Sequence, residues 1–290
     1  MVLATGYACA QQAAVEGFDI ATDGRTVIFA LTSQGRSTVN LLDIEAKTSR
    51  RLLTAEQGYT FTRPRFFGGN NFTVIKSQGL SAELFLASLS GKAPTEIASG
   101  EMITEAMGLE NRNKVYFFKA NEYTKYSSMV QKAPHNMDLY SIDVETREFK
   151  RVTYMKAYRL FEMALSKSGD IYFRWENADS SGVYSLQLDA CCVLKKFRPK
   201  SPDPNMVYHA TLSEEHKKFF FSAMYFIYEY NPRKNQGIQI HSSPGPIDRL
   251  AVNPQKDEVI FSARADSRLF FIDFDGNAKD TIDCAGVIEN

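Results

Sequence analysis

The sequence predicts an all-β protein built from six similar four-stranded sheets. Runs of alternating apolar and polar residues recur along the chain, and 21 Phe and 14 Tyr against a single Trp favour strands. The stretch DLYSIDVETREFKRVT, at 138–153, shows the unit: an alternating strand, a four-residue turn and a second strand. VNLLDIEAKTSRRLL (39–53) and RLFFIDFDGNAKDTI (268–282) have the same layout.

The polar residue at the end of each alternating strand, here called the anchor position, gives the repeat length. Its occurrences are Asp43, Ser88, Asp143, Gln187, Glu229 and Asp273, separated by 45, 55, 44, 42 and 44 residues. A hairpin lies upstream of each. In the first unit its turn is Thr22-Asp23-Gly24, where Gly supplies the positive φ that a tight turn needs.

Four antiparallel strands in about 44 residues are typical of a propeller blade, whose two apolar faces are covered by neighbouring blades. The units extend from about Val15 to Ile282. We therefore predict a six-bladed β-propeller as a single domain over residues 15–290, after an N-terminal segment at 1–14. A pair of β-sandwiches is the alternative, but it does not require six equivalent turns at even spacing.

Within the N-terminal segment, Ala8-Cys9-Ala10 before Gln11 has the small-x-small form of a signal-peptidase site. The preceding apolar stretch is short and has no basic residue, so a trimmed export signal, a lipoprotein cysteine at Cys9 and an ordinary N-terminus are alternatives. We expect an exported, periplasmic protein. No run of about 18 apolar residues predicts a transmembrane segment.

Charge and cysteine content exclude several classes of protein. Thirty-four basic and 34 acidic residues cancel, which gives no global electrostatic case for binding nucleic acid or an acidic membrane. The chain has four cysteines, two of them adjacent at Cys191 and Cys192, which is too few for a disulfide framework. Their spacing is also not that of the ligands of a structural zinc site. The sequence has no G-x-S-x-G nucleophile elbow, and we expect no cofactor.

The third unit is about ten residues longer than the others, and its excess falls between the second and third strands. This insertion, at 119–137, is polar and contains Tyr123 and Tyr126. We expect an extended hairpin or loop that reaches beyond the rim. Because recognition concentrates in loops on rigid scaffolds, it is either a binding loop or a tolerated surface insertion.

The first strand of each blade is expected to line the central channel. Four residues before the end of each first strand, the aligned positions are Gly17, Arg63, Glu105, Glu162, His209 and Arg249. Two residues later on the first strands of the first and second units, the next side chains expected to face the channel are Asp19 and Arg65. These charges form either a polar mouth that binds an anionic or peptide ligand, or a mutually neutralising ring that keeps the channel solvated.

Two further features leave alternatives open. A channel metal, as in a lyase or lactonase propeller, needs several ligands, and only His209 with Glu105 and Glu162 is placed to supply them. The aromatic run at 219–234 is either blade packing or a stacking surface for carbohydrate or peptide. Within it, Tyr228 and Tyr230 are expected to be the most exposed.

The repeat resembles the TolB-like (WD-like) propeller repeat family. The matching stretches are ATDGRTVIFA (21–30), LSKSGDIYF (165–173), VIFSA (259–263), DLYSID and RLFFID. The second and fifth units depart from the pattern, with Gly68-Gly69-Asn70 and Glu214-Glu215-His216 at the first turn. The resemblance implies a closed propeller, common among exported bacterial proteins, that acts as a binding platform rather than a catalyst.

We accordingly expect a non-enzymatic monomer that binds a protein, peptide or glycan partner. The predicted binding residues are Arg63, Arg65, Glu105, Glu162, His209 and Arg249 at the channel, with Tyr123 and Tyr126 in the insertion. The alternative is a hydrolase or lyase that acts on a sugar or lactone with a channel-bound metal.

Overall fold

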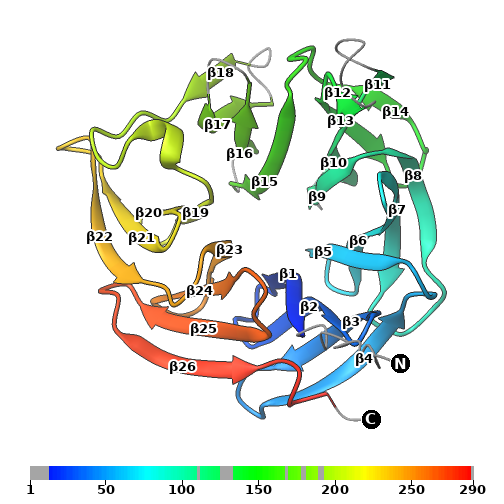
Figure 1. The fold of residues 1–290 in the computed structure, drawn as a ribbon, viewed down its shortest axis with the longest axis horizontal. Helices are drawn as coiled ribbons and strands as arrows, with labels where there is room; N and C mark the ends of the chain where they lie inside the picture. Colours follow the sequence, from blue (N-terminus) through cyan, green and yellow to red (C-terminus); the bar gives the residue numbers. More distant parts are fainter. Residues whose placement is uncertain are drawn as a thin grey trace, which may run out of the picture.

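Six four-stranded antiparallel sheets surround a central channel in the computed structural model of this protein (Figure 1). The structure describes residues 13–109, 112–124, 133–166, 169–177, 181–188 and 193–288. The fold is an all-β six-bladed propeller, as the repeat predicts. Within the described ranges, no helix is long and apolar enough to cross a membrane.

The strands of each blade follow one another outward from the channel in chain order. The innermost strands are β1 (Ala14–Ile20), β5 (Thr60–Phe67), β9 (Ile103–Leu109), β15 (Arg159–Leu165), β19 (Ala210–Ser213) and β23 (Ile247–Val252). The second strands are β2 (Thr26–Ser33), β6 (Asn71–Gln78), β10 (Lys114–Lys119), β16 (Asp170–Glu176), β20 (Lys218–Ala223) and β24 (Glu258–Ala263).

The outer half of each blade continues this order. The third strands are β3 (Arg36–Asp43), β7 (Ser81–Ser88), β13 (Asp138–Asp143), β17 (Ser181–Gln187), β21 (Phe226–Asn231) and β25 (Arg268–Asp273). The outermost strands are β4 (Thr48–Thr54), β8 (Thr95–Glu101), β14 (Phe149–Arg151), β18 (Val193–Lys196), β22 (Gln236–Ser242) and β26 (Ala278–Asp283). A 3-10 turn, η2 (Pro204–Met206), precedes β19.

The hydrophobic core lies between blades, because each sheet has an apolar side chain on both faces. Phe29 of the first blade packs in one cluster with Phe271 of the sixth. Ile75 of the second blade packs in another cluster with Phe117 of the third. All four of these side chains are buried. Stacking of adjacent blades therefore supplies the apolar burial that a single sheet cannot provide.

The anchor position has a local structural cause. The Asp43 carboxylate accepts hydrogen bonds of 2.9 Å from the backbone N–H groups of Glu45 and Ala46, which closes the turn between β3 and β4. Asp143 and Asp273 cap the corresponding turns of blades 3 and 6 in the same way. An aspartate at this position favours the turn, which explains why the repeat is visible in the sequence.

One anchor assignment is wrong. Glu229 lies inside β21, where it pairs with Phe220, whereas the strand ends at Asn231. The Asn231 side-chain oxygen accepts a hydrogen bond of 3.1 Å from the backbone N–H of Lys234, so Asn231 is the residue that corresponds to Asp43. The aromatic alternation FIYEY conceals this two-residue shift, because moving by two keeps each side chain on the same face.

In the described residues, blade 1 consists of β1 to β4 and blade 6 of β23 to β26, so neither blade takes a strand from the other where the ring closes. Near the C-terminus, Ile288 forms a parallel bridge with Ser49 of β4, and the Ser49 hydroxyl donates to the Val287 carbonyl at 3.0 Å. The Lys47 ammonium lies 2.8 Å from the Asp280 carboxylate across the same junction. Polar contacts therefore join the outer edges of the first and last blades.

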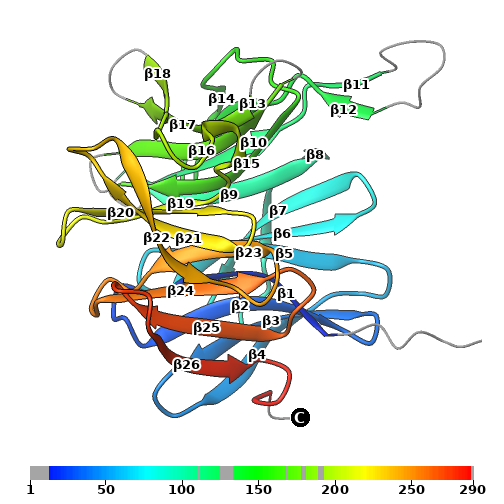
Figure 2. The ribbon, with the colours of Figure 1, turned by 60° about the vertical axis from the view of Figure 1, so that its left-hand side comes forward.

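The insertion at 119–137 forms a hairpin, as expected. Its strands β11 (Glu122–Thr124) and β12 (Ala133–His135) pair antiparallel, and Figure 2 shows them extending beyond the body of the propeller. At its base, the Asn121 side-chain amide donates to the buried Asp138 carboxylate at 2.9 Å. Tyr126 lies outside the described residues.

The packing of blade 2 on blade 3 gives a first test. A methyl group added at Gly108 would lie 1.9 Å from the buried Phe67 ring, whereas one at Gly69 meets nothing within 4 Å. We expect Gly108→Ala to lower the free energy of unfolding by about 1–3 kcal/mol, and Gly69→Ala to leave it within about 0.5 kcal/mol. Urea unfolding measures both, and equal stability of the two variants would contradict this packing.

Candidate binding site at the mouth of the channel

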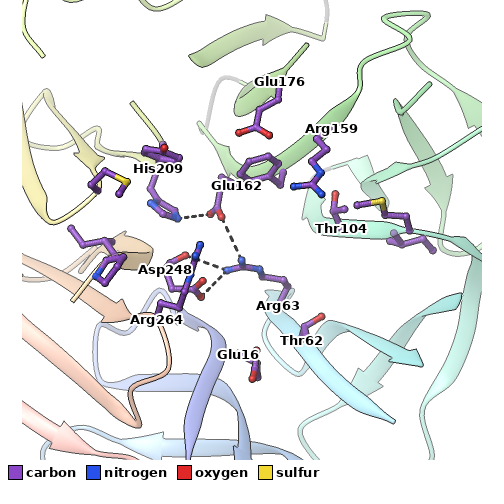
Figure 3. Close-up of a pocket in the computed structure, with 17 residues that line it drawn as sticks. Glu16, Thr62, Arg63, Thr104, Arg159, Glu162, Glu176, His209, Asp248 and Arg264 are labelled. Atoms are coloured by element: carbon purple, nitrogen blue, oxygen red, sulfur yellow. Dashed lines mark hydrogen bonds and ion pairs between the residues drawn. The ribbon is translucent and has the colours of Figure 1, made fainter. Parts of the chain in front are cut away.

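A cavity of about 680 Å³ opens at the end of the channel where the innermost strands begin (Figure 3). We call this end of the propeller the mouth face. Every blade contributes lining residues from the first part of its innermost strand or from the two residues before it, and six of them occupy equivalent positions. These six residues are Glu16, Thr62, Thr104, Phe161, Tyr208 and Asp248. The volume falls within the range of small-molecule and peptide side-chain sites.

Each of these residues directly precedes one of the positions that the sequence predicts to face the channel. Consecutive residues of a regular strand point to opposite sides, so both cannot face the channel without a break in the alternation. The pairing registers show that break in five innermost strands. The irregularities lie between Val15 and Phe18, Thr62 and Arg65, Ile103 and Glu105, Phe161 and Ala164, and Ile247 and Arg249.

The bulges place residues in unusual backbone conformations. Gly17 has φ +128°, while Arg63 and Glu162 have φ +51° and +60°, a region that non-glycine residues rarely occupy. At Gly17 an added Cβ would lie 3.1 Å from the Arg63 Cα. The first blade therefore has only backbone at the position where the other blades carry a channel-facing side chain. The Arg63 side chain occupies the space that a side chain at Gly17 would need.

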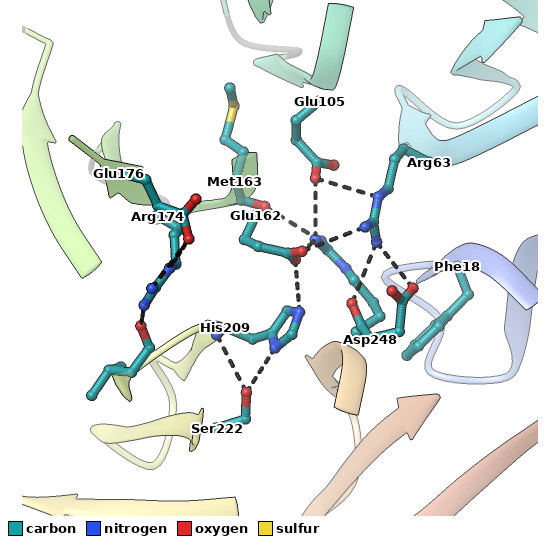
Figure 4. A network of polar contacts seen from close by, with 12 residues as sticks. Phe18, Arg63, Glu105, Glu162, Met163, Arg174, Glu176, His209, Ser222 and Asp248 are labelled. Carbon is teal, nitrogen blue, oxygen red and sulfur yellow. Dashed lines mark hydrogen bonds and ion pairs between the residues drawn. The ribbon is translucent and has the colours of Figure 1, made fainter. Parts of the chain in front are cut away.

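The bottom of the cavity rests on a buried ion-pair cluster (Figure 4). The Arg65 Nη2 atom lies 2.7 Å from the Glu105 carboxylate, and both side chains are at most 1% exposed. Arg65 also donates to the Phe18 carbonyl at 3.3 Å and to the Met163 carbonyl at 3.4 Å. This arginine therefore links the first, second, third and fourth blades beneath the cavity.

Glu162 is the centre of the layer above. Its carboxylate lies 3.0 Å from His209 Nε2, 3.4 Å from Arg63 Nη2 and 3.7 Å from Arg249 Nη1. The other nitrogen of His209 lies 2.7 Å from the Ser222 hydroxyl, which fixes the ring orientation. Side chains from blades 2, 4, 5 and 6 thus meet at one carboxylate.

The environment moves the pKa values of the two glutamates in opposite directions. Burial raises the pKa of Glu105, and Arg65 and Arg63 only partly offset this. Burial also acts against ionisation of Glu162, but His209 and Arg63 outweigh it and lower its pKa to about 2. For Arg63, Glu162 and Asp248 outweigh the effect of burial and raise the pKa. The cluster therefore retains its central carboxylate in the charged form.

The sequence-predicted channel residues divide into two groups. Arg63, Glu162 and His209 line the cavity. Arg65, Glu105 and Arg249 are buried within the cluster and do not line it. Whether any of them binds a ligand stays a prediction. Tyr123, on β11, is 39% exposed and belongs to the hairpin rather than to the cavity wall.

Several lining residues were not predicted from the sequence. Beyond the six at the strand beginnings, they include Arg159, Glu176, Met224 and Arg264. Two signals for the bulges were present, because Gly17 and Pro64 both lie inside expected strands, where such residues mark irregular pairing. Met224 and Arg264 follow the second strands of blades 5 and 6, in turns whose direction no pattern specified.

The residues that the alternative of a channel metal would need, His209 with Glu105 and Glu162, do not fit a cation. The Arg249 Nη1 atom lies 3.6 Å from the Glu105 carboxylate and 3.7 Å from the Glu162 carboxylate. A guanidinium group thus occupies the position between the two acids where a divalent ion would bind. Among the described residues, no group of three or more His, Cys, Asp or Glu side chains is arranged to hold a metal.

Exposed apolar side chains gather at the mouth face. Because the second strand of a blade runs antiparallel to the first, the turn after it lies on this face, as do the connections between blades. Of eleven exposed large apolar residues in the described ranges, eight lie in or beside these segments: Leu80, Tyr123, Tyr154, Tyr158, Met206, Met224, Tyr225 and Phe226. The β11–β12 hairpin rises from the same face.

The aromatic run at 219–234 mostly packs between blades. Phe220 and Phe221 are fully buried, and Tyr228 stacks on Phe221 with ring centroids 5.2 Å apart. Tyr228 and Tyr230 are only partly exposed, so the expectation that they are the most exposed residues of the run is wrong. Instead, the turn after β20 exposes Tyr225, which is 40% accessible.

Comparison of the sequence with protein families finds one match. The family described as the dipeptidyl peptidase IV (DPP IV) N-terminal region matches residues 15–179, more than half of the 290-residue chain. No curated protein sequence matches this chain.

Solved structures share the fold at low sequence identity. TolB from Acinetobacter baumannii is 14% identical, with a TM-score of 0.64 over 89% of this chain and 76% of that one. A nidogen/laminin complex is 11% identical, with a TM-score of 0.67 over 89% and 92%. Oligogalacturonate lyase from Vibrio parahaemolyticus is 13% identical, with a TM-score of 0.56 over 93% and 77%. At such identities the likeness concerns the fold alone.

The central carboxylate gives a pH-dependent test of the cluster. The pKa of Glu162 is about 2 in the folded protein against an ordinary value of 4.5, so its stabilising effect is full above pH 4.5 and declines towards pH 2. We expect Glu162→Gln to lose about 3 kcal/mol of unfolding free energy at pH 7. The difference from the wild type should narrow as the pH falls below 4.5.

Urea unfolding between pH 3 and pH 7 measures this difference. Glu45→Gln is the matched control, because Glu45 forms an ion pair with Arg25 in which both side chains are about half exposed. A Glu162→Gln deficit that stays constant across this pH range would contradict the assigned ion pairs.

Proposed function

Because this chain belongs to the dipeptidyl peptidase IV N-terminal region family, we propose that it is a propeller binding platform whose mouth face holds a protein or peptide partner. Within this proposal the chain binds its partner and does not itself catalyse a reaction. The observation that supports it most directly is the coincidence of a lined cavity and eight exposed apolar side chains on one face.

The distribution of apolar surface favours a protein or peptide over a glycan. Exposed Tyr, Met and Phe side chains at one face are the residues that protein interfaces use as anchors. They come from separate turns and connections of blades 2 to 5 rather than from one row of rings, and Met224 among them also lines the cavity. A peptide segment can contact this rim and place one side chain in the cavity.

The buried cluster supports the same proposal in a different way. Its ion pairs fix the backbone bulges from which the cavity wall projects, so the wall is rigid before a partner arrives. A preformed site loses less conformational entropy on binding than a mobile one. The hairpin of blade 3 projects beyond the body of the propeller and adds a more extended contact surface at the mouth face.

Peptide capture tests the proposal. A pool of random nonapeptides is incubated with immobilised protein, and retained peptides are identified by mass spectrometry. We expect Tyr158→Ser with Tyr225→Ser to reduce retention at least about tenfold, because buried aromatic anchors dominate such interfaces. The control is Phe149→Ser with Ile238→Ser, two exposed apolar residues away from the mouth face. Equal loss in both double variants, or no capture by the wild type, would refute the proposal.

We also infer that the protein is exported. The support is the Ala8-Cys9-Ala10 pattern before Gln11, which lies outside the described residues. Expression in a Gram-negative host should yield a periplasmic chain whose N-terminus, read by mass spectrometry, is Gln11. Replacing Ala10 by a bulky residue should block this cleavage, and recovery of the unprocessed chain in the cytoplasm alone would contradict export.

A further inference from the structure

Three of the four acidic side chains in the cavity wall have basic partners. Asp248 and Glu162 both contact Arg63, each at 3.4 Å. Glu176 lies 3.3 Å from Arg174, which is itself 3% exposed and held by the backbone carbonyls of the η2 segment. These acids are therefore neutralised from within the protein.

Two arginines in the wall lack such partners. Among the described residues, neither Arg159 nor Arg264 forms an ion pair or a side-chain hydrogen bond, although both line the cavity and are exposed. Arg159 lies at the start of β15 and Arg264 in the turn after β24, so they approach from blades 4 and 6, on either side of blade 5. Figure 3 shows both side chains at the cavity.

The remaining unpaired acid is a weak counter-charge. Glu16 lines the cavity from blade 1 without an ion pair in the described ranges. Burial and the neighbouring Asp248 raise its pKa, and Arg63 only partly opposes this. The unpaired groups at the mouth therefore consist of two permanently charged guanidiniums and one carboxyl group whose charge is disfavoured.

An apolar wall lies between the two arginines. Phe161, Met224 and Ile247 line the cavity from blades 4, 5 and 6. Tyr208 adds an aromatic ring that is fixed from behind, because the Arg174 guanidinium lies 4.0 Å from its centroid. The sector around blade 5 thus combines apolar surface with positive charge at both edges.

We propose that this sector binds a carboxylate group of a peptide, held between Arg159 and Arg264, with the adjacent apolar side chain against Phe161 and Met224. This inference rests on the proposed function and specifies its ligand. Guanidinium groups match carboxylates geometrically and form charge-assisted hydrogen bonds with them. A singly charged carboxylate fits better than a dianionic phosphate, since Glu16 and Asp248 are also in the wall.

Three pools of random pentapeptides test the proposal against immobilised protein. The first has a free C-terminal carboxylate and no acidic residue. The second is C-terminally amidated with one Asp or Glu, and the third is amidated with no acidic residue. We expect retention of the first or second pool at least about tenfold above the third, and the pool that is preferred identifies the source of the carboxylate.

The variant that tests the site is Arg159→Gln with Arg264→Gln. Its control is Arg25→Gln with Arg51→Gln, which removes the same charge from the opposite end of blade 1 and from its outermost strand. We expect the first variant to lose the preference for carboxylate-containing peptides and the salt dependence of that preference. The control should retain both. Thermal melting confirms that both variants are folded.

The outcomes separate the two proposals. Capture of all three pools to the same extent would overturn the carboxylate site and leave the binding platform in place. A carboxylate preference that survives in Arg159→Gln with Arg264→Gln would overturn the assignment to these arginines. Capture of none of the pools would remove the proposed function together with this inference.

Discussion

The ion pair between Arg65 and Glu105 is the interaction on which the channel depends. Six strands that converge on one axis bring charged side chains together where water is excluded, and such charges are stable only when paired. Arg65 pairs with Glu105 at 2.7 Å and also binds carbonyl groups of blades 1 and 4. The centre of the ring is thereby held by polar contacts, while the blades are held by apolar packing.

The same pairing divides the channel into a structural layer and an accessible layer. Glu105 and Arg249 are 0% and 5% exposed and do not line the cavity. Arg63 and Glu162 belong to both layers, because each contacts the cluster and also lines the cavity. The buried level therefore corresponds to the mutually neutralising ring, and the ligand site, which the sequence left as the alternative, stays a prediction for the accessible level.

Much of this could be predicted from the sequence, because the repeat depends on local chemistry. Aspartates such as Asp43 cap a turn within a few residues, so their spacing reveals the blades directly. The channel positions followed from strand alternation and included Arg63 and Glu162. The alternation of inward- and outward-facing side chains breaks where a bulge adds a residue. For this reason Asp248, and the lining residues at the same position in other blades, were not predicted. Arg264 lies in a turn, and only the closed ring brings it to the cavity.

The bulges connect the cluster to the cavity wall. In β15, Phe161 faces the cavity and the next residue, Glu162, faces the cluster, although both belong to one strand. The positive φ of Glu162 costs conformational energy that its contacts with His209 and Arg63 offset. The position of the Phe161 ring is thus fixed by ion pairs one residue away. The ion pairs thus arrange the surface around Phe161, and Arg159, which has no acidic partner among the described residues, lies two residues earlier on the same strand.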